Sequence, residues 1–271
     1  MNEGLPRLKW HMLRRRVTDP AHLRRNLDAG LLAGAALEVD LVATADGSFV
    51  CLHDLTLDRE TTGAGPVAAQ SGEDIRRLRQ RGADGAPLDS PPLFFDEVVA
   101  AVARNPHWDR QVQLDIKLPA EQFGAEMLDT LRRMLGDLAP AFIVGTTDAE
   151  IYAGVRASAP EIAVGFDPLA LHEETPPGTV DAFAALADQT LQLGPSARIY
   201  YLNADLILGG LEKGINLVER VTVDGAEVDA WTVDPTRPNI REVLRRLVEA
   251  GCHQITTNAP DALLPMLQEV A

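Results

Sequence analysis

The stretch Ala36-Leu37-Glu38-Val39-Asp40-Leu41 places two carboxylates in an otherwise apolar run. Side chains alternate between the two faces of a strand, so Glu38 and Asp40 point to the same side. A second stretch, Val112-Gln113-Leu114-Asp115-Ile116-Lys117, carries an acid and a base at the same alternation. In α/β barrels such polar residues face inward at the carboxyl ends of the strands. The two stretches therefore predict neighbouring strands with a shared polar rim.

Outward from these two strands, short apolar runs alternate with longer amphipathic segments along the chain. Eight such βα units predict a TIM barrel, (β/α)8, in one domain spanning residues 1–271. The segment from Phe49 to Pro92, which contains an extra strand, a Gly-rich turn and a charged helix, predicts an insertion on the rim. The predicted barrel strands are Leu8–His11, Ala36–Leu41, Gln111–Ile116, Phe142–Gly145, Ile162–Phe166, Arg198–Tyr201, Glu227–Thr232 and His253–Thr256.

Helices fill the gaps between the strands. Asn239 and Gly251 are predicted to cap the seventh helix, and Pro260 is predicted in the first turn of the last one. One short helix is expected before Asp224. The remaining predicted helices are Ala21–Ala33, Phe95–Val102, Ala120–Leu138, Ala149–Ala157, Val180–Thr190, Ile240–Ala250 and Ala259 to the end.

The composition limits the kinds of partner. The chain has 271 residues, and its 40 acidic against 25 basic residues give a net charge of −15. This charge repels nucleic acids and anionic membrane surfaces, while a small anionic substrate can still bind beside a cation. No apolar run approaches the ~18 residues of a membrane span, so no stable membrane insertion is expected. The start, MNEGLPRLKWH, lacks the apolar region of a signal peptide, so a cytoplasmic location is expected. Cys51 and Cys252 are predicted to be buried free thiols.

Three carboxylates and one lysine form the candidate metal site. Glu38, Asp40 and Asp115 would give three hard oxygen ligands, the kind that Mg²⁺ or Ca²⁺ prefers. Lys117, on the same strand as Asp115, would then hold a substrate oxygen. The alternative is structural: the acids form salt bridges with arginines of neighbouring elements, and Lys117 pairs with Asp115.

Two histidines stand where apolar strands meet the same rim. His11 ends the first predicted strand, and His53 follows the run Val50-Cys51-Leu52. Cleavage of a phosphodiester needs a proton acceptor, a proton donor and positive charge near the non-bridging oxygens. The two histidines and the metal site would supply all three. Four other histidines are expected at the surface or in packing: His22, His107, His172 and His253.

The segment His53–Val67, HDLTLDRETTGAGPV, resembles the signature of glycerophosphodiester phosphodiesterases. The stretches Leu114–Lys117, Ala230–Asp234 and Ile255–Leu263 are similar to other strand ends of that family. The resemblance implies a TIM barrel of the phospholipase C-like phosphodiesterase type. It implies His11 and His53 as the acid/base pair, and Glu38, Asp40 and Asp115 as the metal ligands. It also implies Lys117 as a phosphate contact and Trp231 as an apolar wall of the site.

The chain departs from the family pattern after the first strand. The family has His-Arg-Gly there, whereas this chain has Met12 in place of the phosphate-binding arginine, and its Pro-Glu-Asn stretch is not matched. The candidates to replace the arginine are Arg14, Arg15 and Arg59. The run Arg14-Arg15-Arg16 is otherwise expected to be a solvated loop, and Arg59 is expected to pair with Asp54.

Together these features predict an enzyme, a metal-dependent phosphodiesterase that hydrolyses glycerophosphodiesters or related small phosphodiesters by His/His acid-base catalysis. One alternative is a degenerate barrel that binds metal and anion without turnover. Another is a lipid-directed phosphodiesterase of the same superfamily. The identity of the reaction product would distinguish this enzyme from a glycerophosphodiester phosphodiesterase. The sequence makes no prediction of oligomeric state.

Overall fold

The computed structural model describes residues 5–105, 111–173 and 176–270. Eight parallel strands run in the order β1-β9-β8-β7-β6-β5-β4-β2, and pairing of β1 with β2 closes the barrel. The predicted (β/α)8 barrel is confirmed. The strands are β1 Arg7–Trp10, β2 Ala36–Ala43, β4 Val112–Ile116, β5 Phe142–Thr146, β6 Ala163–Phe166, β7 Ile199–Asn203, β8 Glu227–Trp231 and β9 Gln254–Thr257.

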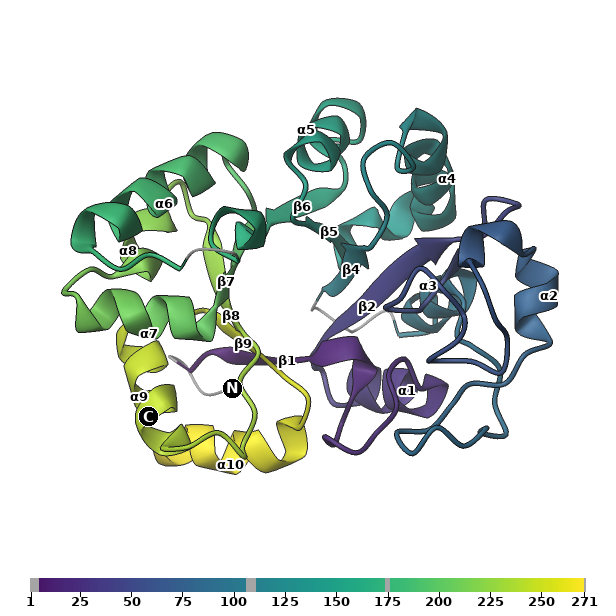
Figure 1. The fold of residues 1–271 in the computed structure, drawn as a ribbon, viewed down its shortest axis with the longest axis horizontal. Helices are drawn as coiled ribbons and strands as arrows, with labels where there is room; N and C mark the ends of the chain where they lie inside the picture. Colours follow the sequence, from purple (N-terminus) through teal and green to yellow (C-terminus); the bar gives the residue numbers. More distant parts are fainter. Residues whose placement is uncertain (1–4, 106–110, 174–175, 271) are drawn as a thin grey trace.

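The helices lie outside the strands (Figure 1). The α-helices are α1 Arg24–Leu32, α2 Gly72–Arg76, α3 Phe95–Ala103, α4 Ala125–Leu135, α5 Ala149–Ser158, α6 Val180–Leu193, α7 Ala204–Glu212, α8 Leu217–Val221, α9 Ile240–Glu249 and α10 Pro260–Glu269. Short 3-10 turns are η1 His11–Leu13, η2 Val67–Ala69, η3 Gly136–Ala141 and η4 Leu169–Leu171. The apolar core lies between the ring of strands and the surrounding helices, because alternate side chains of each strand point outward to the helices.

The register of β2 and β4 sets the polar rim. Asp40 pairs directly with Asp115 in this parallel ladder, and Glu38 pairs with Gln113. Leu37, which has the opposite orientation on β2, packs so closely on α1 that a Cβ at Gly30 would lie 2.5 Å from it. Helix packing therefore fixes β2 by its apolar face and leaves the carboxylates to face the barrel interior.

Two helix predictions were wrong. The chain continues after β7 into α7, whereas only one short helix was expected before Asp224. The neighbouring glycines Gly209 and Gly210 argue against a helix by propensity, and burial of the surrounding leucines overrides them. Helix α1 begins at Arg24 and not at Ala21, because His22 has the left-handed φ of 54°, which a helix cannot include.

The predicted caps of the last two helices have mixed outcomes. Asn239 stands at the N-cap of α9 as predicted, but it adopts φ 54° and its side chain makes no capping hydrogen bond. Gly251 has φ 89°, the conformation expected after the end of that helix. Pro260 lies in the first turn of α10, as predicted.

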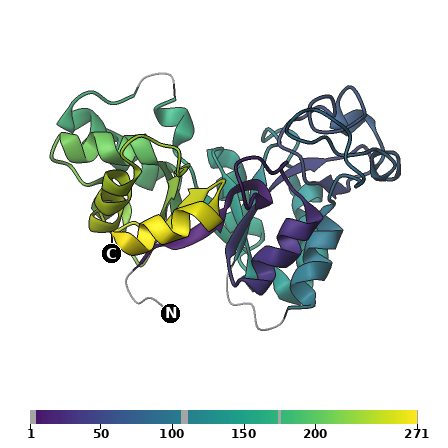
Figure 2. The same ribbon diagram turned by 90° about the horizontal axis from the view of Figure 1, so that it is seen from below.

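The rim insertion begins with β3, Phe49–Val50, which pairs antiparallel with the end of β2. It continues through the Gly-rich turn and α2 and stands beside the barrel (blue in Figures 1 and 2). Thr61 is fully buried and donates its hydroxyl to Leu57 O at 2.7 Å, which folds the turn back on itself. The insertion is therefore an ordered part of the rim and holds His53 at its start.

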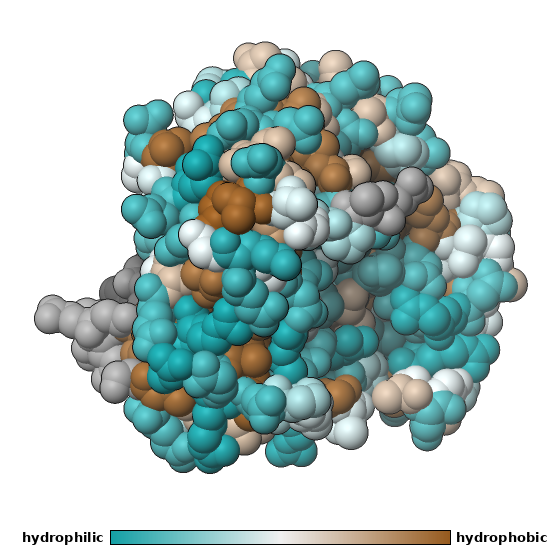
Figure 3. Space-filling model, turned by 60° about the vertical axis from the view of Figure 1, so that its left-hand side comes forward, coloured by the Kyte–Doolittle hydropathy of each residue, from teal (hydrophilic) through white to brown (hydrophobic). Residues whose placement is uncertain are grey.

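The hydrophilic surface and the buried cysteines are those expected from the composition. The face in Figure 3 is mostly hydrophilic, with a hollow between its two halves. Cys51 and Cys252 are buried free thiols, as predicted, and burial raises the pKa of Cys252 to about 12. Among the helices of the described residues, none is long and apolar enough to cross a membrane.

Candidate active site

A cavity of about 300 Å³ opens at the carboxyl ends of the barrel strands. Residues of all eight barrel strands, or of the turns that directly follow them, border it. Six of the seven predicted site residues line it: His11, Glu38, His53, Asp115, Lys117 and Trp231. The seventh, Asp40, is fully buried directly beside Asp115. The structure therefore brings together residues from opposite ends of the sequence.

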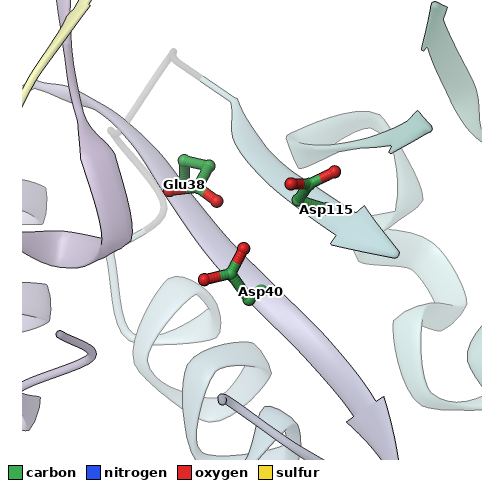
Figure 4. A group of neighbouring side chains, drawn as sticks. All are labelled: Glu38, Asp40 and Asp115. Carbon is green, nitrogen blue, oxygen red and sulfur yellow. The ribbon is translucent and has the colours of Figure 1, made fainter. Parts of the chain in front are cut away.

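The three predicted metal ligands converge. Glu38 and Asp40 on β2 and Asp115 on β4 offer oxygens that all lie within 4.8 Å of one another (Figure 4). Both oxygens of Asp40 are buried, and neither has a hydrogen-bond partner among the described residues. Three acids share one lysine here, and this excess of buried negative charge is costly, so a divalent cation would relieve that cost. The donor set fits a hard cation such as Mg²⁺ or Ca²⁺.

Lys117 supplies positive charge at this cluster. Its Nζ lies 3.0 Å from Asp40 Oδ1 and 2.5 Å from Asp115 Oδ2. Burial lowers the pKa of Lys117, and the carboxylates outweigh burial, so the net pKa lies above its usual range. For Asp40, burial raises the pKa, but the contact with His22 and the charge of Lys117 bring it below its usual range. Both groups are therefore charged at neutral pH.

Glu38 has the opposite electrostatic environment. Burial, together with the charges of Asp40 and Asp115, holds the pKa of Glu38 well above its ordinary value. Within the part of the chain that the structure describes, it accepts one hydrogen bond, from the backbone N–H of Met12. Met12 has the left-handed φ of 51°, which aims this N–H at the cluster. At the position where the family has arginine, the chain therefore contributes a backbone donor.

His22 is a site neighbour that the sequence did not reveal. It was expected at the surface or in packing, and it is buried with Nε2 3.3 Å from Asp40 Oδ2. The backbone N–H of Asp40 donates to the same Nε2 at 3.2 Å. The left-handed turn at His22 brings it there, and no motif in the sequence marks such a turn. Of the other three, His172 is buried, His253 accepts from Val228 N, and His107 lies outside the described residues.

A chain of hydrogen bonds holds His11. Its Nδ1 lies 2.8 Å from Asn258 Oδ1, and an amide oxygen only accepts, so Nδ1 carries the proton and Nε2 has a free lone pair. Asp234 fixes the amide, because its Oδ1 accepts from Asn258 N and its Oδ2 from Asn258 Nδ2, both at 2.9 Å. The bond to Asn258 raises the pKa of His11, but burial lowers it by more. The lowered pKa favours the neutral ring.

His53 is held in the same way by a carboxylate. Its Nδ1 lies 2.9 Å from Asp54 Oδ1, which leaves Nε2 free. The predicted pairing of Asp54 with Arg59 is confirmed, with two hydrogen bonds of 2.6 Å. Chiefly because of Arg59, the pKa of Asp54 falls to about 2. Asp54 is therefore ionised and accepts the Nδ1 proton of His53.

The far wall of the cavity is aromatic and polar. Trp231 lines it as predicted, and its buried Nε1 has no hydrogen-bond partner among the described residues. Asp167 also lines the wall, and burial with the charge of Asp115 raises its pKa well above the ordinary value. Asp167 was not among the predicted site residues. Its place directly after strand β6 was the signal that could have found it.

Lys9 lines the cavity from β1, and the sequence analysis assigned it no role. Its Nζ lies 2.9 Å from Asp229 Oδ2 and 4.4 Å from the ring centre of Tyr201. Asp229 Oδ1 accepts from Thr256 Oγ1 at 2.6 Å. This buried pair is satisfied within the barrel, so Lys9 forms part of the floor of the cavity.

The comparisons with known proteins agree with this geometry. Residues 27–262 match the model of the glycerophosphoryl diester phosphodiesterase family. A Mycobacterium tuberculosis protein named "Probable glycerophosphodiester phosphodiesterase 1" is 30% identical over 234 residues, which cover 79% of this chain and 77% of that protein. A glycerophosphodiester phosphodiesterase of Caldanaerobacter subterraneus subsp. tengcongensis is 25% identical, with 88% of each chain covered.

Solved structures have the same fold. A glycerophosphodiester phosphodiesterase from Parabacteroides distasonis has a TM-score of 0.72 at 14% identity, with 99% of each chain covered. An Oleispira antarctica phosphodiesterase, solved with the product sn-glycerol-3-phosphate, has a TM-score of 0.71 at 16% identity, with 97% of each chain covered. At such identities the likeness establishes the barrel.

Proposed function

The chain belongs to the glycerophosphoryl diester phosphodiesterase family, and from this premise we propose that it is a metal-dependent enzyme using His11 and His53 for acid-base catalysis. The observation that carries the proposal is the convergence of both histidines, three carboxylates and a lysine on one cavity of about 300 Å³. The substrate class is glycerophosphodiesters or related small phosphodiesters.

Glu38, Asp40 and Asp115 would hold the cation, with Mg²⁺ and Ca²⁺ as the candidates. A bound cation supplies positive charge beside the non-bridging oxygens of the phosphate. Lys117, held at 3.0 Å from Asp40, adds a second positive charge at the same edge of the cavity. Together these two charges would hold the phosphate, at a site where the chain has Met12 in place of the arginine of the family.

The proton transfers follow from the hydrogen bonds of the two rings. A neutral His11, with Nδ1–H donated to Asn258, can accept a proton from the attacking oxygen through Nε2. His53, with Nδ1–H donated to Asp54, can deliver a proton to the leaving alkoxide through its own Nε2. Asn258 and Asp54 keep each free nitrogen directed into the cavity and act as positioning residues.

The wall opposite the metal site would receive the alcohol part of the substrate. Trp231 presents an aromatic surface and an unpaired Nε1–H. The raised pKa of Asp167 favours its protonated carboxyl. In that form Asp167 could donate a hydrogen bond to a hydroxyl of the alcohol or accept one from it. We also propose a cytoplasmic location, which the two buried reduced thiols, Cys51 and Cys252, support.

Hydrolysis of bis(p-nitrophenyl) phosphate with Mg²⁺, Ca²⁺ or EDTA tests this proposal. His11→Ala and His53→Ala should each lower kcat about 10² to 10⁴-fold, the usual contribution of a general acid or base. The matched control is His253→Ala, a histidine at the opposite end of the barrel that accepts from Val228 N. Turnover that persists in EDTA, or in both active-site variants, would contradict the proposal. Metal binding without turnover would favour the degenerate barrel.

A further inference from the structure

A second cavity, of about 330 Å³, lies between η1 and the rim insertion. Its walls carry three arginines, Arg14, Arg59 and Arg81, and two carboxylates, Asp19 and Glu60. We refer to it as the arginine cavity. In a chain with a net charge of −15, a cavity whose walls carry more cations than anions favours an anion as its occupant.

The two carboxylates of this cavity are already bonded to other groups. Asp19 Oδ2 accepts two backbone N–H groups and Asn26 Nδ2, the latter at 3.1 Å. Glu60 Oε2 accepts the backbone N–H groups of His53 and Asp54 at 2.9 and 3.1 Å. These bonds disperse the negative charge of both residues. Arg59 is paired with Asp54, so Arg14 and Arg81 set the polarity of the cavity.

Two of the arginines have unused donors. Arg14 Nε is buried without a hydrogen-bond partner, while Nη1 donates to Asn258 Oδ1 at 3.0 Å. Arg81 donates to the backbone oxygens of Thr61 and Gly85 at 2.7 and 2.8 Å. Within the described residues, neither Arg14 nor Arg81 has an ion-pair partner. A buried donor without an acceptor is costly, and an anion would remove that cost.

The arginine cavity is linked to both catalytic histidines. The amide oxygen of Asn258 accepts from Arg14 and also from His11 Nδ1. In the same way, the carboxylate of Asp54 accepts hydrogen bonds from both Arg59 and His53 Nδ1. Each histidine is therefore one side chain away from an arginine of this cavity. An anion that draws the guanidinium groups toward itself would change the two contacts that orient the histidine rings.

We propose that the arginine cavity binds a phosphate dianion, as inorganic phosphate or a phosphate monoester, and that binding slows turnover at the neighbouring active site. Guanidinium groups match the oxygens of such a dianion in charge and in hydrogen-bond geometry. Only the effect on turnover rests on the proposed function, because the binding itself can be measured without any reaction.

Calorimetric titration with inorganic phosphate or glycerol 3-phosphate, in EDTA, tests the binding. Without metal, the acidic cluster of the active site repels phosphate, so the arginine cavity is the expected site. Ala83 lines this cavity with an exposed side chain, and Ala83→Glu adds a repelling charge without removing any existing bond. Binding should weaken about tenfold or more in Ala83→Glu and stay unchanged in Ala83→Gln. The tighter of the two probes identifies the source of the dianion.

The same variants test the effect on turnover. With metal present, phosphate should lower kcat for bis(p-nitrophenyl) phosphate in the wild type and in Ala83→Gln, and this effect should be lost in Ala83→Glu. Equal binding by all three proteins, or no binding, would overturn the site. Binding with purely competitive inhibition that Ala83→Glu leaves unchanged would overturn the link to the histidines. A protein without turnover would refute the proposed function, and the titration would still decide whether the cavity binds phosphate.

Discussion

Replacing Glu38 with glutamine should stabilise the metal-free protein, although it removes a metal ligand. Glu38 shares the cluster with Asp40 and Asp115, within 4.8 Å, and forms no ion pair with another described residue. At that distance and an effective dielectric constant of about 20, one carboxylate pair repels by about 3 kcal/mol. Lys117 offsets part of this repulsion, so we expect a net gain of about 1 to 3 kcal/mol in the free energy of unfolding.

The pH dependence follows from the raised pKa of Glu38. Above its ordinary value of 4.5, the folded wild type binds more protons than the unfolded chain, so its stability falls as pH rises until the folded-state pKa is passed. Glutamine does not titrate. The advantage of Glu38→Gln should therefore be absent below about pH 4.5, grow as the pH rises, and be full only above the folded-state pKa of Glu38.

Thermal unfolding followed by circular dichroism measures both effects. In EDTA, at a pH above the folded-state pKa of Glu38, Glu38→Gln should unfold about 2 to 6 °C above the wild type, for a chain of this size. Added Mg²⁺ or Ca²⁺ should raise the Tm of the wild type and leave that of the variant nearly unchanged. A lower Tm of the variant in EDTA, or an undiminished metal effect, would refute the electrostatic reasoning.

Three further predictions concern positioning, the barrel floor and packing. Asn258→Ala should lower kcat about 10 to 100-fold with little change in KM, because His11 loses its orienting contact, and equal kcat in steady-state assays would exclude that role. Lys9→Met should reduce the free energy of unfolding by about 3 to 5 kcal/mol in urea titrations, since it leaves Asp229 buried and unpaired; a neutral result would show another partner. Gly165→Ala should cost about 1 to 3 kcal/mol in the same assay, because its Cβ would lie 2.9 Å from a backbone oxygen, and unchanged stability would mean that the strand shifts.

Alternating patterns in the sequence were enough to predict the strands and the inward-facing acids. Each barrel strand was placed to within two residues, because buried parallel strands read as short apolar runs between helices. The pairing of Asp40 with Asp115 followed from equivalent positions on neighbouring strands. Local periodicity could not predict α7, where tertiary packing overrides the glycines.

The sequence did not predict the positions of residues that depend on irregular backbone. Arg14 was expected in a solvated loop, yet it is partly buried and bonded to Asn258, while Arg15 and Arg16 are exposed as predicted. Met12 was interpreted as a missing arginine, and its left-handed backbone instead directs an N–H at Glu38. The left-handed φ of Met12 has no signal in the sequence, so this contact becomes visible only in the fold.

The most direct test of the central claim is phosphorus NMR of glycerophosphocholine incubated with the purified protein in Mg²⁺, Ca²⁺ or EDTA. The account predicts conversion to a phosphate monoester with one of the two metals and none in EDTA, and Asp115→Asn should need more metal for the same rate. Conversion that is equally fast in EDTA, or a folded protein that binds metal and converts nothing, would contradict it.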